Sequence, residues 1–445
     1  MRIFLTIIVF VLKAVSLCAG YLDTSDSHFL RKDLQKDFGM VDDGGARDQT
    51  KKLQRAIDRI SESGGGRLYL PKGTYSFANV FLKSNVHLRI AADTVIRPYW
   101  PEGGRTVVFH LDSREGKRPG PMSARINIEN VSIRGVGGSF IIDYSNRPYD
   151  KEEGIRAIVC RKVKNFMISD VLIKDSWTRF AAIVFAPDMV AVADEDSIYK
   201  PTDGLVRNCS ATDSNSENGL VQMHAGERIH FEGLAAVGGG VTLRLETSAG
   251  GHRGGIYDIT AKDIYCEDGM SAVLLGPHTA QNGVVEIDGV LAKGCAFAVQ
   301  MGAGFVKREL QRDPSYKPGV FSVGTVVRNI HAEYGENAPL PIKHLGLVRT
   351  ECLGDYRLDK RDRSTRHVRG PSVGIVFDGT RDSWTPAIET ISCEGFEYAR
   401  NIVVEKEIQR VRLEKLLEGY PLLDELRQAE SPRLKPKAPP LPQKF

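Results

Sequence analysis

The most constraining feature of this chain is an eight-residue pattern that recurs eight times between residues 126 and 398. It reads apolar or small, any, apolar, any, turn residue, apolar, any, apolar. Such alternation is typical of short strands with one buried face. The copies are INIENVSI, FMISDVLI, GLVRNCSA, IHFEGLAA, ITAKDIYC, VEIDGVLA, TVVRNIHA and ISCEGFEY.

The fifth position of the pattern is always Asn, Asp or Gly, the residue types that best tolerate a left-handed backbone. Its occupants are Asn130, Asp170, Asn208, Gly233, Asp263, Gly289, Asn329 and Gly395. Two short strands joined by a left-handed corner residue are what a parallel β-helix uses between adjacent faces of a coil. The pattern therefore predicts an all-β fold, a single-stranded right-handed parallel β-helix.

The spacing of the copies supports a solenoid. Copies that begin at residues 204, 229, 259 and 285 lie 25, 30 and 26 residues apart, which suits one coil per repeat. Wider gaps predict long loops or a coil without the pattern, and the charged segments 307–320 and 346–370 are expected to be irregular. A β-sandwich also has short alternating strands, but it would not place a turn residue at one fixed position eight times.

An amphipathic helix is expected ahead of the first coil. Asp48 can cap it, and residues 64–66, all glycine, can end it. Its apolar positions have helical spacing: Leu53, Ala56, Ile57 and Ile60. Such a helix would close the open end of the solenoid as an N-terminal capping helix.

The same region contains D-F-G at 37–39, D-D-G at 42–44 and L-P-K-G-T-Y at 70–75. In these motifs the chain resembles the pectin-lyase-like superfamily. That resemblance implies a β-helix and raises polysaccharides as substrates, since hydrolases and lyases dominate the superfamily. It does not fix the chemistry.

The two ends of the chain differ from its middle. Residues 1–20 are apolar and end in small residues, which predicts a cleaved signal peptide and a secreted, extracellular or periplasmic protein. An uncleaved membrane anchor is the alternative, but Lys13 interrupts the apolar run, so stable membrane insertion is not expected. The β-helix is assigned to residues 21–405, and 406–445 to a helical segment with a disordered Pro/Lys-rich tail.

Charge and cysteines limit the possible partners. Loss of Arg2 and Lys13 with the signal peptide would lower the net charge from +4 to about +2, which argues against nucleic acid. Six cysteines follow residue 20 without any C-x-x-C motif, so buried thiols are expected, although a bridge between Cys160 and Cys352 remains open. No metal site and no required cofactor are predicted, and a monomer is expected. A bound Ca or Na ion stays open, without support in the sequence.

Polar residues that point outward on consecutive coils are the candidates for chemistry. In VTLRLETS, alternation sends Arg244, Glu246 and Ser248 outward. Glu246 lies 17 residues after the start of its repeat, Gln222 lies 18 and His278 lies 19, so the three are expected to stack on one face.

This cluster, with GGGVTLRLETSAGG around the glutamate, resembles the iota-carrageenase family of glycoside hydrolases. The resemblance implies cleavage of an anionic, sulfated galactan with inversion. It assigns the general acid to Glu246 and supporting catalytic roles to Gln222 and His278.

Ser248 departs from that family, which has its catalytic aspartate two residues after the acid. Two carboxylates so placed on one strand would lie roughly 7 Å apart, close to what an inverting hydrolase needs. A serine cannot act as the base unaided. Three possibilities follow: another carboxylate serves, with Asp213, Glu217 and Asp268 as candidates, or the reaction differs, or activity is lost.

The neighbouring residues allow more than one interpretation. Arg244 can bind a sulfate or carboxylate group, or it can form an ion pair with Glu246. His224, Gln300 and Ser248 are further candidates for substrate binding, and His278 follows Gly-Pro and could be a turn residue.

Two other functions remain open. A polysaccharide lyase would need a Lys or Arg base and often clustered carboxylates that hold Ca²⁺, and no such cluster is evident. A non-catalytic carbohydrate-binding β-helix is favoured by Ser248 and opposed by the stack of Gln222, Glu246 and His278.

Overall fold

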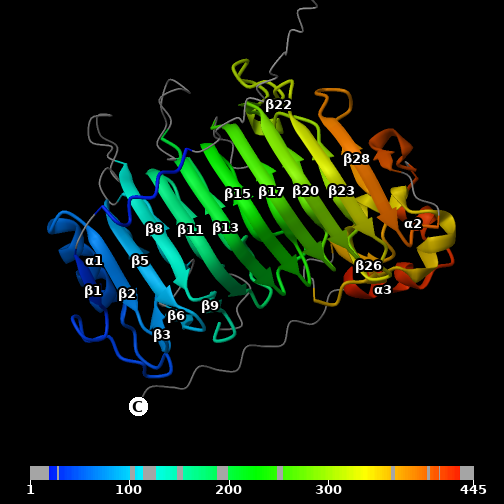
Figure 1. Cartoon of the computed structure of the whole chain (residues 1–445). Coiled ribbons are helices and arrows are strands. Elements are labelled where there is room, and N and C mark those ends of the chain that lie inside the picture. Colours follow the sequence, from blue (N-terminus) through cyan, green and yellow to red (C-terminus); the bar gives the residue numbers. More distant parts are fainter. Residues whose placement is uncertain are drawn as a thin grey trace, which may run out of the picture.

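The computed structural model describes residues 20–430 except 28–29, 101–105, 114–126, 148–153, 188–198, 248–253, 362–365, 398–400 and 410. Within these residues the strands stack as the coils of one solenoid, and the predicted right-handed parallel β-helix is confirmed (Figure 1).

The larger sheet, which we call sheet A, has 14 strands, and those on its main path are joined side by side in parallel. Along this path they are β1 (Arg31–Asp33), β2 (Gly66–Leu70), β5 (Val86–Ala91), β8 (Ile128–Val136), β11 (Val163–Lys174), β13 (Thr202–Thr212), β15 (Gly226–Val237), β17 (Ile256–Glu267), β20 (Val285–Lys293), β23 (Val326–Glu333) and β28 (Ala387–Glu394). Three short strands branch from it: β3 (Thr74–Phe77), β6 (Val95–Pro98) and β9 (Phe140–Asp143).

The second sheet, sheet B, has ten parallel strands and forms another face of the same coils. In spatial order they are β4 (Val80–Phe81), β7 (Thr106–Leu111), β10 (Ile155–Cys160), β12 (Ile183–Phe185), β14 (Gly219–Met223), β16 (Val241–Glu246), β18 (Ser271–Gly276), β21 (Phe297–Gly302), β27 (Val376–Gly379) and β29 (Ile402–Val404). One continuous apolar core fills the space between the two sheets.

Six copies of the sequence pattern stack in the predicted register, those that begin at residues 166, 204, 229, 259, 285 and 325. The first and last copies are displaced by five residues. Val131 pairs with Phe166, whereas Ile126 lies outside the described residues, and Ile391 pairs with Ile330. Each coil has several left-handed corners, so a turn residue in the sequence did not reveal which corner it occupies.

All eight predicted corner residues do have positive φ, between 51° and 81°. In the last coil the corner stacked on Asn329 is Thr390, with φ of 55°. In another row of stacked corners the side chains form a ladder of hydrogen bonds. The Asn165 amide donates to Asn130, and the Asn130 amide donates to Asn85. Amide side chains thus satisfy one another from coil to coil, which explains the preference for Asn beyond its backbone tolerance.

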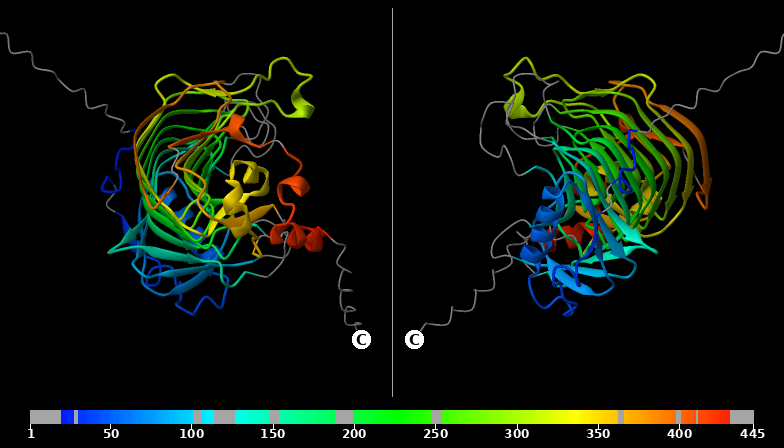
Figure 2. Two further views of the ribbon diagram at one scale, coloured as in Figure 1. Left: turned by 90° about the vertical axis from the view of Figure 1, so that its right-hand side faces the viewer. Right: turned by 60° about the vertical axis from the view of Figure 1, so that its left-hand side comes forward.

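Helix α1 (Thr50–Glu62) lies at the N-terminal end of the solenoid, as expected (Figure 2). Its four predicted apolar residues are all buried. Gln49, rather than Asp48, occupies the N-cap position, while Asp48 Oδ1 accepts a hydrogen bond of 2.9 Å from the Thr50 N–H. The end of the first coil is therefore covered by an amphipathic helix.

Segment 346–370 is more regular than the sequence suggested. A small antiparallel sheet forms from β24 (Ala338–Pro341), β26 (His367–Gly370) and β25 (Arg357–Leu358). It shares a second apolar core with α2 (Leu413–Leu416) and α3 (Pro421–Glu430), which lie along one side of the solenoid (Figure 2). The remaining elements are β19 (Gln281–Asn282), β22 (Val320–Phe321), η3 (Arg308–Leu310), η4 (Ile342–Leu347), η5 (Thr350–Asp355) and η6 (Glu405–Glu407).

The six cysteines are free thiols and four of them are buried, so Cys160 and Cys352 do not form the bridge that the sequence left open. Burial raises the pKa of the Cys160 thiol. In the described part of the chain no helix is both long and apolar enough to cross a membrane. The predicted signal peptide and the tail after residue 430 lie outside the described residues, as does Ser248.

Candidate active site

Three neighbouring strands of sheet B bring the predicted cluster together. Gln222 lies on β14 and is in register with Arg244 on β16, while Glu246 at the end of β16 is in register with Gly276 at the end of β18. His278 follows two residues beyond, with φ of 44°, and this left-handed turn brings its ring back toward β16.

Glu246 receives polar contacts from three side chains. Gln222 Nε2 donates to Oε2 at 3.0 Å, Arg244 Nη2 lies 2.8 Å from Oε2, and His278 Nε2 lies 3.2 Å from Oε1. The side chain of Glu246 is only 14% exposed. The stack that sequence spacing predicted is therefore present, with one carboxylate at its centre.

The electrostatic balance at Glu246 favours its charged form. Burial raises the pKa of this carboxyl, but the charge of Arg244 and the hydrogen bond from His278 outweigh burial and hold the pKa well below its usual value. A general acid must be protonated before it can donate a proton. In the arrangement seen here Glu246 is in the deprotonated form, which is that of a base.

The other predicted binding residues differ in their placement. His224 lies half-buried beside the cluster, where its Nδ1 lies 2.9 Å from the Glu246 carbonyl oxygen, and the partial burial lowers its pKa. Gln300 lies on β21, two strands from Arg244, and is 5% exposed. Its Nε2 donates to the Met270 carbonyl oxygen at 3.5 Å. Gln300 therefore does not contact Glu246.

Two of the three candidate replacements for the missing aspartate lie at the opposite end of the sheet B strands. Asp213 and Asp268 occupy corners that precede β14 and β18. The five steps from Ser271 to Gly276 alone span roughly 16 Å. Glu217 also precedes β14, but its backbone carbonyl accepts a hydrogen bond from Arg244, so it borders the cluster.

Two features near Glu246 had no signal in the sequence. Phe305, from the segment after β21, packs against His278 with ring centroids 4.7 Å apart. Glu217 and His367 approach to 3.9 Å and connect the cluster with the small antiparallel sheet. Neither contact involves residues of the repeated pattern, and Glu217 and His367 are far apart in the chain.

Comparison with known proteins gives matches over different parts of the chain. The family model described as rhamnogalacturonase A/epimerase, pectate lyase-like, matches residues 35–98. The iota-carrageenase of Zobellia galactanivorans is 37% identical over 286 residues, 62% of this chain and 54% of that protein. The iota-carrageenase of Alteromonas macleodii is 31% identical over 297 residues, 63% of this chain and 56% of that protein. The chain thus spans about half the length of these curated relatives.

A solved structure named 1,3-alpha-1,4-beta-D-galactose-4-sulfate 3,6-anhydro-D-galactose-2-sulfate 4 galactohydrolase superposes with a TM-score of 0.77. It is 26% identical, and the match covers 88% of this chain and 94% of that one. In both sequence and coil architecture, therefore, this chain resembles the iota-carrageenases and shares their pectate lyase-like β-helix.

Proposed function

We propose that the protein is a secreted glycoside hydrolase that cleaves a sulfated galactan of the iota-carrageenan type. The observation that carries the proposal is Glu246, a buried carboxylate held by Gln222, Arg244 and His278 on sheet B. The sequence matches to two iota-carrageenases support the substrate class. The reaction needs no cofactor, and a monomer suffices for it.

In this proposal Glu246 is the general acid, and the substrate supplies the change in its pKa. A sulfate ester placed beside Arg244 would draw the guanidinium away from Glu246, because a guanidinium forms bidentate bonds with anionic oxygens. Burial would then dominate and raise the pKa of Glu246. The acid would become protonated only when a sulfated sugar occupies the site.

The general base must be a group other than the side chains that contact Glu246. His278 Nε2 lies 3.2 Å from Glu246, whereas inversion requires about 6.5–9.5 Å between acid and base to admit a water. We assign His278 and Gln222 to positioning roles. The base would be a carboxylate outside the contacts of Glu246, and Glu217, at the border of the cluster, is the candidate that best meets this condition.

Release of reducing ends from iota-carrageenan tests the proposal. Glu246→Gln keeps the shape of the side chain but cannot donate a proton, so activity should fall about 10³-fold. Glu232→Gln, an outward glutamate on sheet A, is the matched control and should keep full activity. Equal activity of Glu246→Gln and the parent would remove Glu246 from its role.

A non-catalytic carbohydrate-binding protein is the second candidate. It is favoured by the low pKa of Glu246, which a binding protein has no need to raise. Binding of iota-carrageenan without any product from it, or from agar and pectin, would support this candidate.

A further inference from the structure

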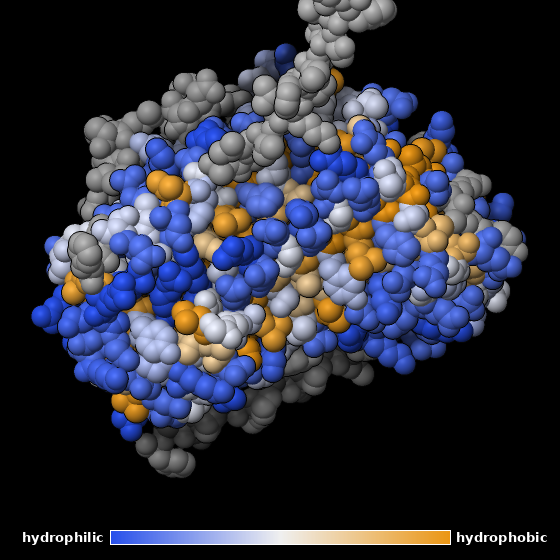
Figure 3. All heavy atoms as spheres, viewed as in Figure 1, coloured by the Kyte–Doolittle hydropathy of each residue, from blue (hydrophilic) through white to orange (hydrophobic). Residues whose placement is uncertain are grey.

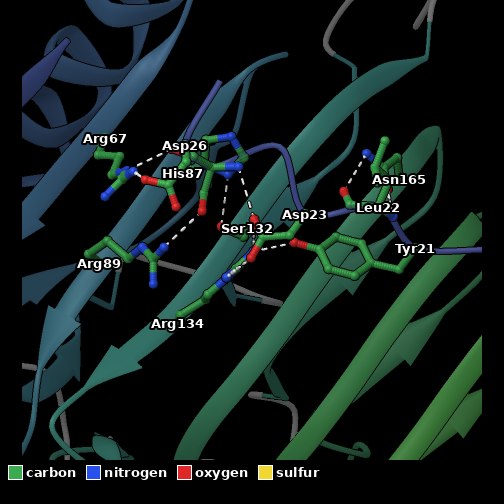
Figure 4. Close-up of polar contacts among 11 residues, drawn as sticks. Tyr21, Leu22, Asp23, Asp26, Arg67, His87, Arg89, Ser132, Arg134 and Asn165 are labelled. Carbon is green, nitrogen blue, oxygen red and sulfur yellow. Dashed lines mark hydrogen bonds and ion pairs between the residues drawn. The ribbon is translucent and has the colours of Figure 1, made fainter. Parts of the chain in front are cut away.

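A cluster of cations lies on the outward face of sheet A, away from the Glu246 cluster. Arg67 on β2, Arg89 on β5 and Arg134 on β8 lie on three neighbouring strands (Figure 4). Arg89 and Arg134 are direct register partners, so two like charges face each other across adjacent strands. We call these three residues the arginine cluster.

Arg89 and Arg134 belong to a row of register partners that face outward on successive strands of sheet A. In the rest of this row the charges neutralise one another. From β13 onward its register partners alternate in sign: Arg207, Glu232, Lys262, Asp288, Arg328 and Glu389. Arg328 and Asp288, for example, form an ion pair of 2.8 Å. Only at the N-terminal coils does the row have adjacent cations.

Segment 20–27 crosses this face and neutralises two of the three arginines. Asp23 accepts bonds of 2.7 and 2.9 Å from the two terminal nitrogens of Arg134, and Asp26 pairs with Arg67. Among the described residues, Arg89 Nη2 donates only to the neutral hydroxyl of Ser25, at 2.9 Å, and the buried Arg89 Nε has no acceptor. Within the described part of the chain, Arg89 is thus a half-buried guanidinium without a carboxylate partner.

An open cavity of about 480 Å³ adjoins this unpaired cation. Arg31, Lys32, Arg67 and Arg89 line it, together with Tyr69, a residue that is 38% exposed. Two carboxylates, Asp33 and Asp37, also line it, against the four cations. Asp37 is engaged by Lys32 at 3.1 Å. Figure 3 shows this face, with hydrophilic side chains gathered over the N-terminal strands.

We infer that this cavity is a second binding site for a sulfated saccharide, remote from the Glu246 cluster. A sulfate ester would occupy the position beside Arg89 that a carboxylate occupies beside Arg134, and a sugar ring would pack on Tyr69. The saccharide class rests on the proposed function. A second site on another face of a long solenoid would hold the polymer near the enzyme between cleavage events.

Binding stoichiometry tests the inference without any hydrolysis. Titration of the Glu246→Gln protein with a short iota-carrageenan oligosaccharide should show one more bound oligosaccharide per chain than the same titration of Glu246→Gln/Arg89→Gln. Affinity for the polymer should fall roughly tenfold with the loss of Arg89. Glu246→Gln/Arg207→Gln is the matched control, since Arg207 lies in the same row outside the cavity, and it should keep the full stoichiometry.

Tyr69→Ala should weaken polymer binding without removing a charge, and it carries the test if Arg89→Gln does not fold. Equal stoichiometry and affinity with and without Arg89 would overturn the inference. So would binding of inorganic sulfate at this site without binding of the oligosaccharide. Because these measurements use a protein that does not cleave, a failure here is distinct from a failure of the proposed hydrolysis.

Discussion

The two arginine-containing clusters of this solenoid differ in their charge balance. On sheet B, Gln222, Arg244 and His278 all converge on the one carboxylate of Glu246. On sheet A, three arginines share Asp23 and Asp26, and Arg89 has no carboxylate partner among the residues that the structure describes. The same β-helix thus presents a carboxylate with surplus donors on one sheet and a surplus cation on another.

This difference shows how one kind of ligand could act in two ways. A sulfate ester at the arginine cluster would supply the missing anion and simply bind. At sheet B it would compete with Glu246 for Arg244 and thereby change the protonation of a side chain. Register in a parallel solenoid makes both arrangements possible, because it stacks side chains of successive coils at about 4.8 Å.

Among substitutions in the two clusters, Arg244→Met should have the largest effect, on both the pKa of Glu246 and kcat/KM. It removes the cation that holds the pKa of Glu246 low, so that pKa should rise and the alkaline limb of kcat/KM should move to higher pH. Loss of the bond to sulfate should also lower kcat/KM on iota-carrageenan about 10- to 100-fold. An unchanged alkaline limb would mean that Arg244 does not control the acid.

Asp23→Asn should make the two clusters more different. It frees Arg134, so the arginine cluster gains an unpaired charge and should bind a sulfated oligosaccharide several-fold more tightly. The unfolding free energy should fall by about 1 kcal/mol, a value reduced because Asp23 is half exposed. Isothermal titration and urea denaturation measure the two effects, and weaker binding would contradict the account.

The stability lost in Asp23→Asn should depend on pH. The pKa of Asp23 is held well below its usual value, chiefly by the hydrogen bond from Arg134. A depressed carboxyl pKa stabilises the fold above the unfolded value of about 4, and this contribution disappears as the pH falls through the folded pKa. The difference between parent and variant should therefore shrink from pH 6 to pH 3, whereas a constant difference would assign the effect to packing.

Arg328→Gln should have the smallest effect. It breaks the exposed pair with Asp288 in the self-neutralising part of the row, and such pairs contribute about 0–1 kcal/mol. Oligosaccharide binding should stay within twofold of the parent. A large loss of binding would extend the saccharide site beyond the N-terminal coils.

Local rules made much of the fold predictable. Alternation identified the strands, and fixed turn residues such as Asn208 and Asp263 identified the left-handed corners. The displaced copies at Asn130 and Gly395 show the limit of predicting register from turn residues, because several corners of one coil use the same residue types. The charged sequence of segment 346–370 indicates an irregular segment, because residues from distant segments are needed to complete the apolar core that it shares.

The Gln222, Glu246 and His278 cluster was also predictable, because coil spacing brought it together. The pKa of Glu246 was not, since it depends on how Arg244 and His278 orient. The arginine cluster could not be predicted from the sequence for a similar reason. Arg89 and Arg134 are 45 residues apart, and only the register of β5 with β8 makes them neighbours.

The pH profiles of kcat and kcat/KM on iota-carrageenan test the central claim most directly, because kcat/KM reports the free enzyme and kcat the enzyme–substrate complex. We expect the alkaline limb of kcat to lie at least about one pH unit above that of kcat/KM, since bound sulfate would release Glu246 from Arg244. Coincident limbs in the two profiles would contradict a substrate-induced rise in the pKa of Glu246.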